Sequence, residues 1–307
     1  MAKVTNAFDT YTAVDKREDY IDKIYNISPS ATPLLSLAGV SNASGVYHEW
    51  QTDALPSATS SGELEGATFA GASNSATTRV GNYCMIKSRN AVVTGTQEAV
   101  QKAGVKSELA YQIAKQTAAL KLDIDTCISQ KASSVAGDAS TARVTRGIEA
   151  FITTNQSKAS DGSTTSGTVT DGTQRTFTET LLKAALQTTF TTGGNPTKML
   201  LGAAQKAVFS GFAGRSATTV PVDAKTVEAA VDVYAGDFHR LEAVPSRNIR
   251  NRTALLIDPE FIRVAYLRKF VQKNYEELGD AKATQIITEF ALQVDNEGAH
   301  SKVADLS

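Results

Sequence analysis

The segment of residues 107–135 most constrains what this chain folds into, because its pattern predicts one helix longer than most domains need. Ser107 stands at the N-cap position and Gly137 follows the expected end. At 1.5 Å per residue the helix would be roughly 43 Å long and would span most of the molecule. One apolar stripe supports it, made of Leu109, Ile113, Leu120, Ile124, Cys127 or Ile128, and Val135.

Two runs with strand character flank a long polar segment. Residues 46–55 alternate, with His48 and Trp50 on the same face, and residues 80–93 form a second run. The residues between them, 56–79, are mostly Ser, Thr, Gly and Ala, which cannot support a core of their own. A hairpin with legs of about 12 residues would be about 40 Å long, so it is predicted to protrude from a globule whose radius of gyration would be near 19 Å.

The two ends of the chain also read as extended. Residues 1–43 form an arm, in which Pro29 and Pro33 prevent a long helix. Its apolar side chains, Ile24, Leu34 and Leu35, are expected to be buried between subunits. Residues 284–294 alternate strictly and predict a strand of about 36 Å, well beyond the usual length.

The middle of the chain predicts a mixed α/β region. Residues 153–176 are rich in Ser, Thr and Gly and predict a surface loop. Thr176 and Glu179 have capping-box spacing ahead of a helix. Further elements are expected in this order: a strand near 198–202, a helix near 204–212, and strands near 227–234, 238–244 and 253–257.

Charge excludes some functions. The 307 residues contain 31 Lys and Arg against 32 Asp and Glu, a net charge of -1, so no strong field attracts nucleic acid. A local excess lies in residues 240–273, with eight basic and three acidic residues. Three interpretations stay open for it: a solvated face, pairing with an acidic surface of another copy, or contact with nucleic acid.

Signal-peptide and membrane-spanning patterns are not found in the sequence, which predicts that the protein folds in a cytoplasm.

Motifs for catalysis are missing from the sequence. His48, His239 and His300 share no ligand spacing, and Cys84 and Cys127 fit no zinc motif. The glycines before Lys198 lack the P-loop order. We therefore predict no catalytic, cofactor-binding or metal-binding residues. Elements too long for one globule instead predict a self-assembling structural protein.

Seven segments resemble the major capsid proteins of tailed bacteriophages in the SU10-like family, which have the Hong Kong 97 (HK97-like) capsid fold. The resemblance covers nearly the whole chain except residues 156–174 and the neighbourhood of 215–225. In chain order the segments are REDYIDKIYNISPSATPLLS, HEWQTDAL, RVGNY, GTQEAV, SELAYQIAK, SVAGDASTARVTRGIEAFITTN and GDAKATQIITEFALQVDNEGAH.

The resemblance implies an α+β fold with four parts. Residues 1–43 would be the N-terminal arm and 44–95 the extended E-loop hairpin. The peripheral P-domain would comprise 96–150 and 259–307, with the spine helix at 107–135. The axial A-domain would comprise 151–258.

The resemblance also implies a structural role and no enzyme activity. Copies would assemble into hexamers and pentamers of an icosahedral shell around the double-stranded DNA genome, without sequence-specific binding and without membrane contact. A portal protein, a separate scaffolding protein and, as an open alternative, a decoration protein would be partners. The protein would be located in the virion after assembly in the host cytoplasm. Lys87 lies in the expected E-loop, but no motif assigns it to a crosslink. The alternatives are an encapsulin-type compartment shell and, more distantly, an enzyme of unrecognised class.

Overall fold

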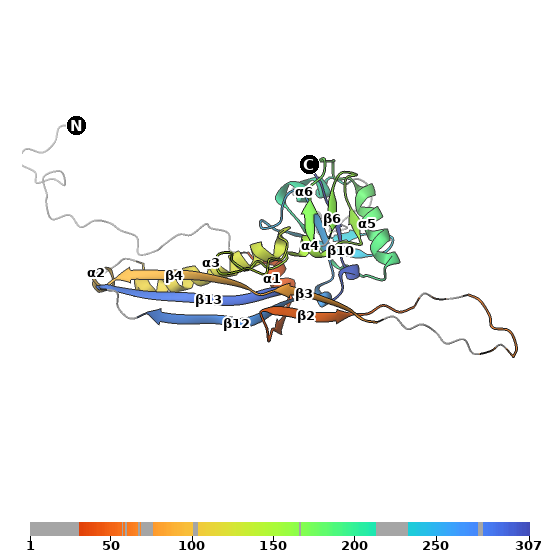
Figure 1. Cartoon of the computed structure of the whole chain (residues 1–307). Coiled ribbons are helices and arrows are strands. Elements are labelled where there is room, and N and C mark those ends of the chain that lie inside the picture. The colour runs from red at the N-terminus through yellow and green to blue at the C-terminus, as the bar shows by residue number, and fades with distance from the viewer. Residues whose placement is uncertain are drawn as a thin grey trace, which may run out of the picture.

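A computed structural model describes the chain over residues 31–212, 233–275 and 279–307, apart from 57, 59, 67, 69–75, 101–103 and 166. The described part is elongated (Figure 1). A long sheet and one helix run side by side, a second layer of strands and helices sits over one end of them, and a hairpin extends beyond that end (Figure 1). Of the arm expected at residues 1–43, residues 1–30 lie outside the described part of the chain.

The long sheet has four strands in the order β1-β12-β13-β4. β12 (Ile262–Tyr275) and β13 (Ala281–Val294) are antiparallel and have 14 residues each. β4 (Met85–Thr94) pairs with β13, and β1 (Gly39–Asn42) pairs in parallel with the first part of β12. The long strand expected at residues 284–294 is confirmed and begins three residues earlier. β12 was not predicted, because its second half carries polar and charged residues on both faces.

The long helix is α3 (Glu108–Ser129), with Ser107 as its N-cap, as predicted. The predicted extent of 107–135 is wrong at the C-terminus, where Gln130 is already extended. Val135 pairs instead with Val144, and the N–H of Gly147 donates to the carbonyl of Ala132. The chain after α3 turns back to form these contacts, and tertiary pairing ends the helix although the apolar spacing continues.

The hairpin consists of β2 (Tyr47–Thr52) and β3 (Thr78–Tyr83). The prediction that residues 80–93 form one leg is wrong, because the chain leaves the hairpin at Cys84 and continues as β4 in the long sheet. Each paired leg has six residues, about 20 Å at 3.3 Å per residue. The described part of the loop that joins the legs extends away from the molecule (Figure 1).

The second layer is a six-stranded sheet in the order β5-β14-β11-β8-β10-β9. Its strands are β5 (Gln156–Ser157), β8 (Lys198–Leu201), β9 (Val233–Ala235), β10 (Arg240–Pro245), β11 (Ala254–Ile257) and β14 (Ser301–Val303). The strands expected near 198–202, 238–244 and 253–257 are thereby confirmed. Of the one expected near 227–234, only its last two residues are described.

Helices α5 (Glu179–Thr191) and α6 (Ala203–Ser210) pack with this sheet. The N-cap of α5 is Thr178, whose side chain accepts from the N–H of Leu181, so the predicted capping role of Thr176 is wrong. Short helices complete the described chain: α1 (Pro33–Leu37), α2 (Gly95–Ala99), α4 (Ile148–Phe151), and the 3-10 turns Pro259–Phe261 and Glu297–Ala299.

The polar stretch 153–176 is more ordered than a surface loop. It forms β5 and a small hairpin, β6 (Ser163–Thr165) with β7 (Thr168–Thr170). Thr164 is buried, and its hydroxyl accepts a hydrogen bond from the ammonium group of Lys302 at 2.6 Å. A buried lysine elsewhere in the chain therefore holds this polar segment, which local composition cannot show.

Candidate assembly surfaces

The three histidines lie far apart, and one ring nitrogen of each has a hydrogen-bond partner. The Nε2 atom of His48 lies 3.0 Å from Gln293 Oε1, Nδ1 of His239 lies 3.1 Å from Asn195 Oδ1, and Nδ1 of His300 accepts from the N–H of Asp258. Within the described ranges, His, Cys, Asp and Glu form no group of three suited to a metal ion.

Both cysteines are free thiols, and Cys84 is buried. Burial raises the pKa of Cys84 to about 11, so this thiol is a poor nucleophile at neutral pH. None of the helices in the described part of the chain is long and apolar enough to cross a bilayer. The surfaces that remain for function are those that the single chain leaves open.

The described end of the arm is anchored within its own subunit. Leu34 is fully buried in the core between α1, α3 and the long sheet. The N–H of Leu35 donates to Asp125 of α3 at 2.7 Å, and the amide of Asn248 donates to the other carboxylate oxygen at 2.5 Å. Burial raises the pKa of Asp125.

This anchoring corrects the expectation that Leu34 is buried between subunits, whereas burial of the exposed part of Leu35 there stays a prediction. Leu34 is already inaccessible in the single chain, and Leu35 is half-buried against the same core. Pro33 starts the five-residue helix α1, which turns Leu34 inward. Ile24 lies outside the described residues, so its burial between subunits stays a prediction.

The base of the hairpin is fixed by one buried asparagine on β3. The amide nitrogen of Asn82 donates to Thr145 Oγ1 at 2.9 Å and to the carbonyl of Leu292 at 2.8 Å. Its carbonyl oxygen accepts from the N–H of Arg146 at 2.8 Å. Because β3, the segment after α3 and β13 all meet at this side chain, the hairpin leaves the molecule in a defined direction.

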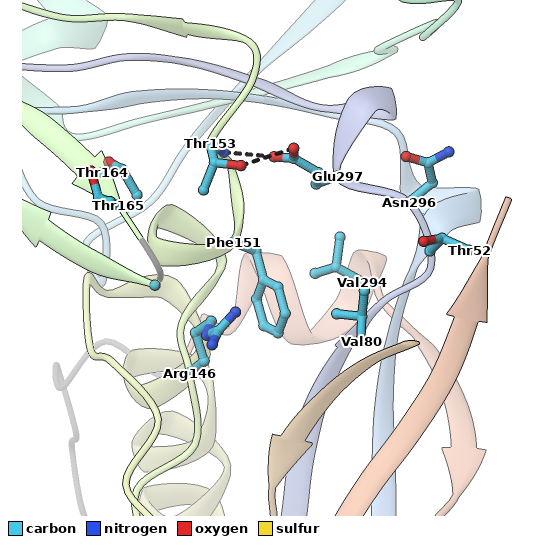
Figure 2. A pocket seen from close by; sticks show the side chains of 11 residues that line it. Thr52, Val80, Arg146, Phe151, Thr153, Thr164, Thr165, Val294, Asn296 and Glu297 are labelled. Carbon is cyan, nitrogen blue, oxygen red and sulfur yellow. Dashed lines mark hydrogen bonds between the residues drawn. The ribbon is translucent and has the colours of Figure 1, made fainter. Parts of the chain in front are cut away.

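A cavity of about 580 Å³ lies where the hairpin base meets the second layer (Figure 2). Its apolar side is formed by Val80, Phe151 and Val294. The carboxylate of Glu297 lies at one end and points toward Thr153 (Figure 2). The guanidinium group of Arg146 lies beside the ring of Phe151, 4.8 Å from its centroid.

The two charged side chains of this cavity, Glu297 and Arg146, differ in the number of hydrogen-bond partners that they have. Glu297 accepts from the N–H and hydroxyl groups of both Thr153 and Thr154. Arg146 has only a long contact with Ser134 Oγ at 3.5 Å, and its Nε is buried without an acceptor among the described residues. Burial lowers the pKa of Arg146.

A charged network joins the long sheet and α3 region to the second layer. Arg250 pairs with the buried carboxylate of Glu149 and with Asp171 at 3.0 Å, and Lys131 also pairs with Asp171 at 2.5 Å. The ammonium group of the fully buried Lys302 donates to the carbonyl of Glu149. Burial lowers the pKa of Lys302 to about 8.

The basic segment 240–273 is therefore divided. Four of its eight cations pair with acids of the same chain, namely Arg250, Arg252, Arg263 and Arg268. The other four are exposed and pair with no acid among the described residues: Arg240, Arg247, Lys269 and Lys273. Internal pairing, which was not among the three interpretations, accounts for half of the cluster.

The end of the long sheet away from the second layer is left open. Residues 268–275 of β12 are all exposed, including Phe270 at 37%, Val271 at 41% and Tyr275 at 50%. β1 pairs only with residues 263–266, so the outer edge of this half of β12 has no neighbouring strand among the described residues. An unpaired strand edge of this length is a template for contact with another chain.

The hairpin tip is the most exposed apolar part of the described chain. The side chains of Leu55 and Leu64 are 95% and 83% exposed. The only charged residues between positions 53 and 77 are Asp53, Glu63 and Glu65. The described part of the tip therefore carries two exposed leucines, and the charged residues of this segment are all acidic.

Asn82, Asp125 and Arg146 were not singled out by sequence reasoning. An asparagine inside a strand run is unfavourable, so Asn82 in RVGNY was a usable signal for a special contact. Asp125 and Arg146 have no such signal, because their partners are 90 and 64 residues away in the chain.

Comparisons with known proteins agree with this architecture. The chain matches the family model of the SU10 major capsid protein over residues 3–307. No curated protein sequence matches it. Among solved structures it is similar to the capsid asymmetric unit of cyanophage A-1(L), with a TM-score of 0.68 and 15% identity over 97% of this chain and 99% of that one.

Two further similar structures are the capsid of a native GTA particle and the major capsid proteins of phage G, solved with decoration proteins. The first has a TM-score of 0.66 and 12% identity, covering 98% of this chain and 100% of that one. The second has a TM-score of 0.54 and 10% identity, covering 100% of both. The predicted α+β Hong Kong 97 fold is thereby confirmed, and the chain belongs to the SU10 major capsid protein family of bacteriophage shell proteins.

Proposed function

We propose that copies of this chain assemble into hexamers and pentamers and close an icosahedral shell around a double-stranded DNA genome. The observation that carries the proposal is the exposure of apolar side chains on the two protruding elements, the hairpin tip and the open half of β12. Leu55 and Leu64 are almost fully exposed, and no described residue of the same chain covers them. Burial of such side chains against neighbouring copies supplies the driving force for assembly.

Weak contacts are sufficient for this purpose. In a closed shell every subunit holds several neighbours at once, so the effective concentration at each further contact is high and individual contacts stay reversible. A net charge of -1 limits the repulsion between many copies. Because this charge creates no strong positive field, the shell would enclose DNA without binding it tightly or sequence-specifically.

The four-part division at residues 1–43, 44–95, 96–150 with 259–307, and 151–258 is our working assignment of arm, E-loop, P-domain and A-domain. The described pairing supports it with two refinements. β4, assigned to the E-loop, pairs with β13 in the long sheet, and β14, assigned to the P-domain, pairs with β11 in the second layer.

The partners follow from the same role. A shell filled with DNA needs an entry point, for which a portal protein is proposed, and correct curvature, for which a separate scaffolding protein is proposed. A decoration protein is a further candidate partner. The protein would assemble in the host cytoplasm and be located in the virion.

Negative-stain electron microscopy of the purified protein, alone and together with the scaffolding protein from the same phage genome, tests this function. We expect closed particles some hundreds of ångströms wide. A protein that elutes as a 32.5 kDa monomer under every condition, with and without the scaffold, would contradict the proposal. An enzyme would also behave as a discrete small species, so the particle image separates the two classes.

A further inference from the structure

The cavity at the hairpin base contains a cation that has no counter-charge among the described residues. The guanidinium of Arg146 lies 4.8 Å from the centroid of the Phe151 ring and 3.5 Å from Ser134 Oγ. Arg146 is half-buried, and its Nε is buried without an acceptor among the described residues. A cation that is partly removed from water normally has an anionic or strongly polar partner, because its desolvation is otherwise uncompensated.

The backbone that carries this cation is fixed. The backbone N–H of Arg146 donates to Asn82, and its carbonyl accepts from the same amide at 3.3 Å. Glu297, the other charge of the cavity, has four donors of its own and does not pair with Arg146. The cavity thus offers a guanidinium group on a fixed backbone and an apolar side made of Val80, Phe151 and Val294 (Figure 2).

The hairpin tip of the same chain has the complementary chemistry. Glu63, Leu64 and Glu65 are consecutive and exposed, so they present a large apolar side chain between two carboxylates. No Lys, Arg or His lies between positions 53 and 77. About 12 residues separate the paired base at Thr52 from Leu64, which gives an extended reach of about 40 Å.

We propose that this cavity receives the segment Glu63-Leu64-Glu65 of a second copy, with one carboxylate on Arg146 and Leu64 on the apolar side. The contact joins the tip of one copy to the hairpin base of the next. It is therefore head-to-tail, and such contacts close into rings when the rotation between copies permits. The inference rests on the proposed assembly function and names the pair of surfaces that the hairpin uses.

A charge exchange tests the pairing. Arg146→Glu alone, and Glu63→Arg with Glu65→Arg, are each expected to raise the protein concentration needed for half-maximal particle formation by roughly tenfold or more. The combined variant with all three substitutions is expected to recover most of this loss. Arg79→Glu is the matched charge reversal, because Arg79 is an exposed cation on β3 and does not line the cavity. Circular dichroism melting of each unassembled variant shows whether it is folded.

Disulfide trapping supplies a second readout that does not depend on assembly yield. Chains with Leu64→Cys are assembled together with chains with Thr165→Cys, since Thr165 lines the cavity. Under mild oxidation we expect covalent dimers that contain one chain of each kind, and none with either variant alone. Both kinds of chain also carry Cys127→Ala, because Cys127 is a free thiol that is only half-buried, whereas Cys84 is buried.

The outcomes separate the two proposals. If wild-type protein forms shells but the charge exchange does not recover assembly and no mixed dimer appears, another segment or no segment occupies the cavity, and this inference is wrong while the assembly function stands. If wild-type protein forms no particles at all, the assembly function itself fails. Recovery together with mixed dimers supports the pairing.

Discussion

The two halves of β12 differ sharply although they belong to one strand and pair with the same neighbour. In the first half, Ile262, Val264 and Ala265 are almost fully buried, because β1 and the second layer cover them. In the second half, residues 268–275 are exposed. Among the described residues, the core is therefore complete at one end of the long sheet only, and the proposed assembly would cover the other end with other copies.

Charge follows the same division. At the covered end, Arg250 is surrounded by carboxylates of its own chain. In the open half of β12, Lys269 and Lys273 have no acidic partner among the described residues. The paired charges stabilise the single subunit, and under the proposed assembly the unpaired ones would be available for contacts between subunits. Four predictions test this division.

The largest effect is expected from Glu149→Ala at the covered end. Glu149 is 1% exposed and binds Arg250 and the hydroxyl of Thr253. Without the Glu149 carboxylate, the positive charges of Arg250 and the nearby Lys302 have fewer negative charges to offset their burial. The free energy of unfolding should therefore fall by about 3–5 kcal/mol. Urea unfolding of unassembled protein measures this. A fall below about 1 kcal/mol would mean that the network does not hold the two layers together.

Leu34→Ala is expected to lower the free energy of unfolding by about 3 kcal/mol, because it removes a fully buried side chain and leaves a cavity. Leu55→Ala is the matched control and should change it by less than about 0.5 kcal/mol, since Leu55 is 95% exposed. Equal effects of the two substitutions would show that the arm is not anchored in its own subunit.

The protonation of His300 should lower the free energy of unfolding at acidic pH. Burial lowers the pKa of His300 from 6.5 to about 4, and its Nδ1 accepts from the N–H of Asp258. The folded state therefore favours the neutral ring, and its stabilisation is present above pH 6.5 and is lost as the pH falls toward 4. At pH 5 the loss is about 2 kcal/mol, from 1.5 pH units at 1.36 kcal/mol each.

His300→Asn isolates this contribution, because an amide oxygen can accept the same hydrogen bond without titrating. The variant should lose about 2 kcal/mol less than the wild-type protein between pH 7.5 and pH 5. Both proteins are compared by urea unfolding at each pH, which cancels groups such as Asp125, whose raised pKa acts in the opposite direction. Parallel pH profiles would assign acid sensitivity to other groups.

The smallest effects come from a matched pair on β12 itself. Val264→Thr buries a hydroxyl group at a position that is 1% exposed and should lower the free energy of unfolding by about 1–3 kcal/mol. Val271→Thr, at a position that is 41% exposed, should change it by less than about 0.5 kcal/mol. If both cost the same, the two halves of the strand are equally buried in solution, and the comparison fails.

Sequence patterns were most successful where burial is periodic. The spine helix and the strand ending at Val294 were predicted, because one face of each is apolar along its length. β12 was missed because its open half shows no alternation: Arg268, Lys269, Gln272 and Lys273 occupy both faces. Expected absences of catalytic, cofactor and metal residues stay predictions.

By itself, the sequence determined the dominant elements, the low net charge and the family resemblance, because these depend on local spacing and on motifs that can be read in order. Only the tertiary structure decided where α3 ends, that Leu34 is buried in its own subunit, and that the backbone of Arg146 is held by Asn82 while its guanidinium has no counter-charge among the described residues. The physical reason is the same in each case. These properties depend on contacts between residues far apart in the chain, and no local pattern records which distant group will satisfy a buried donor or charge.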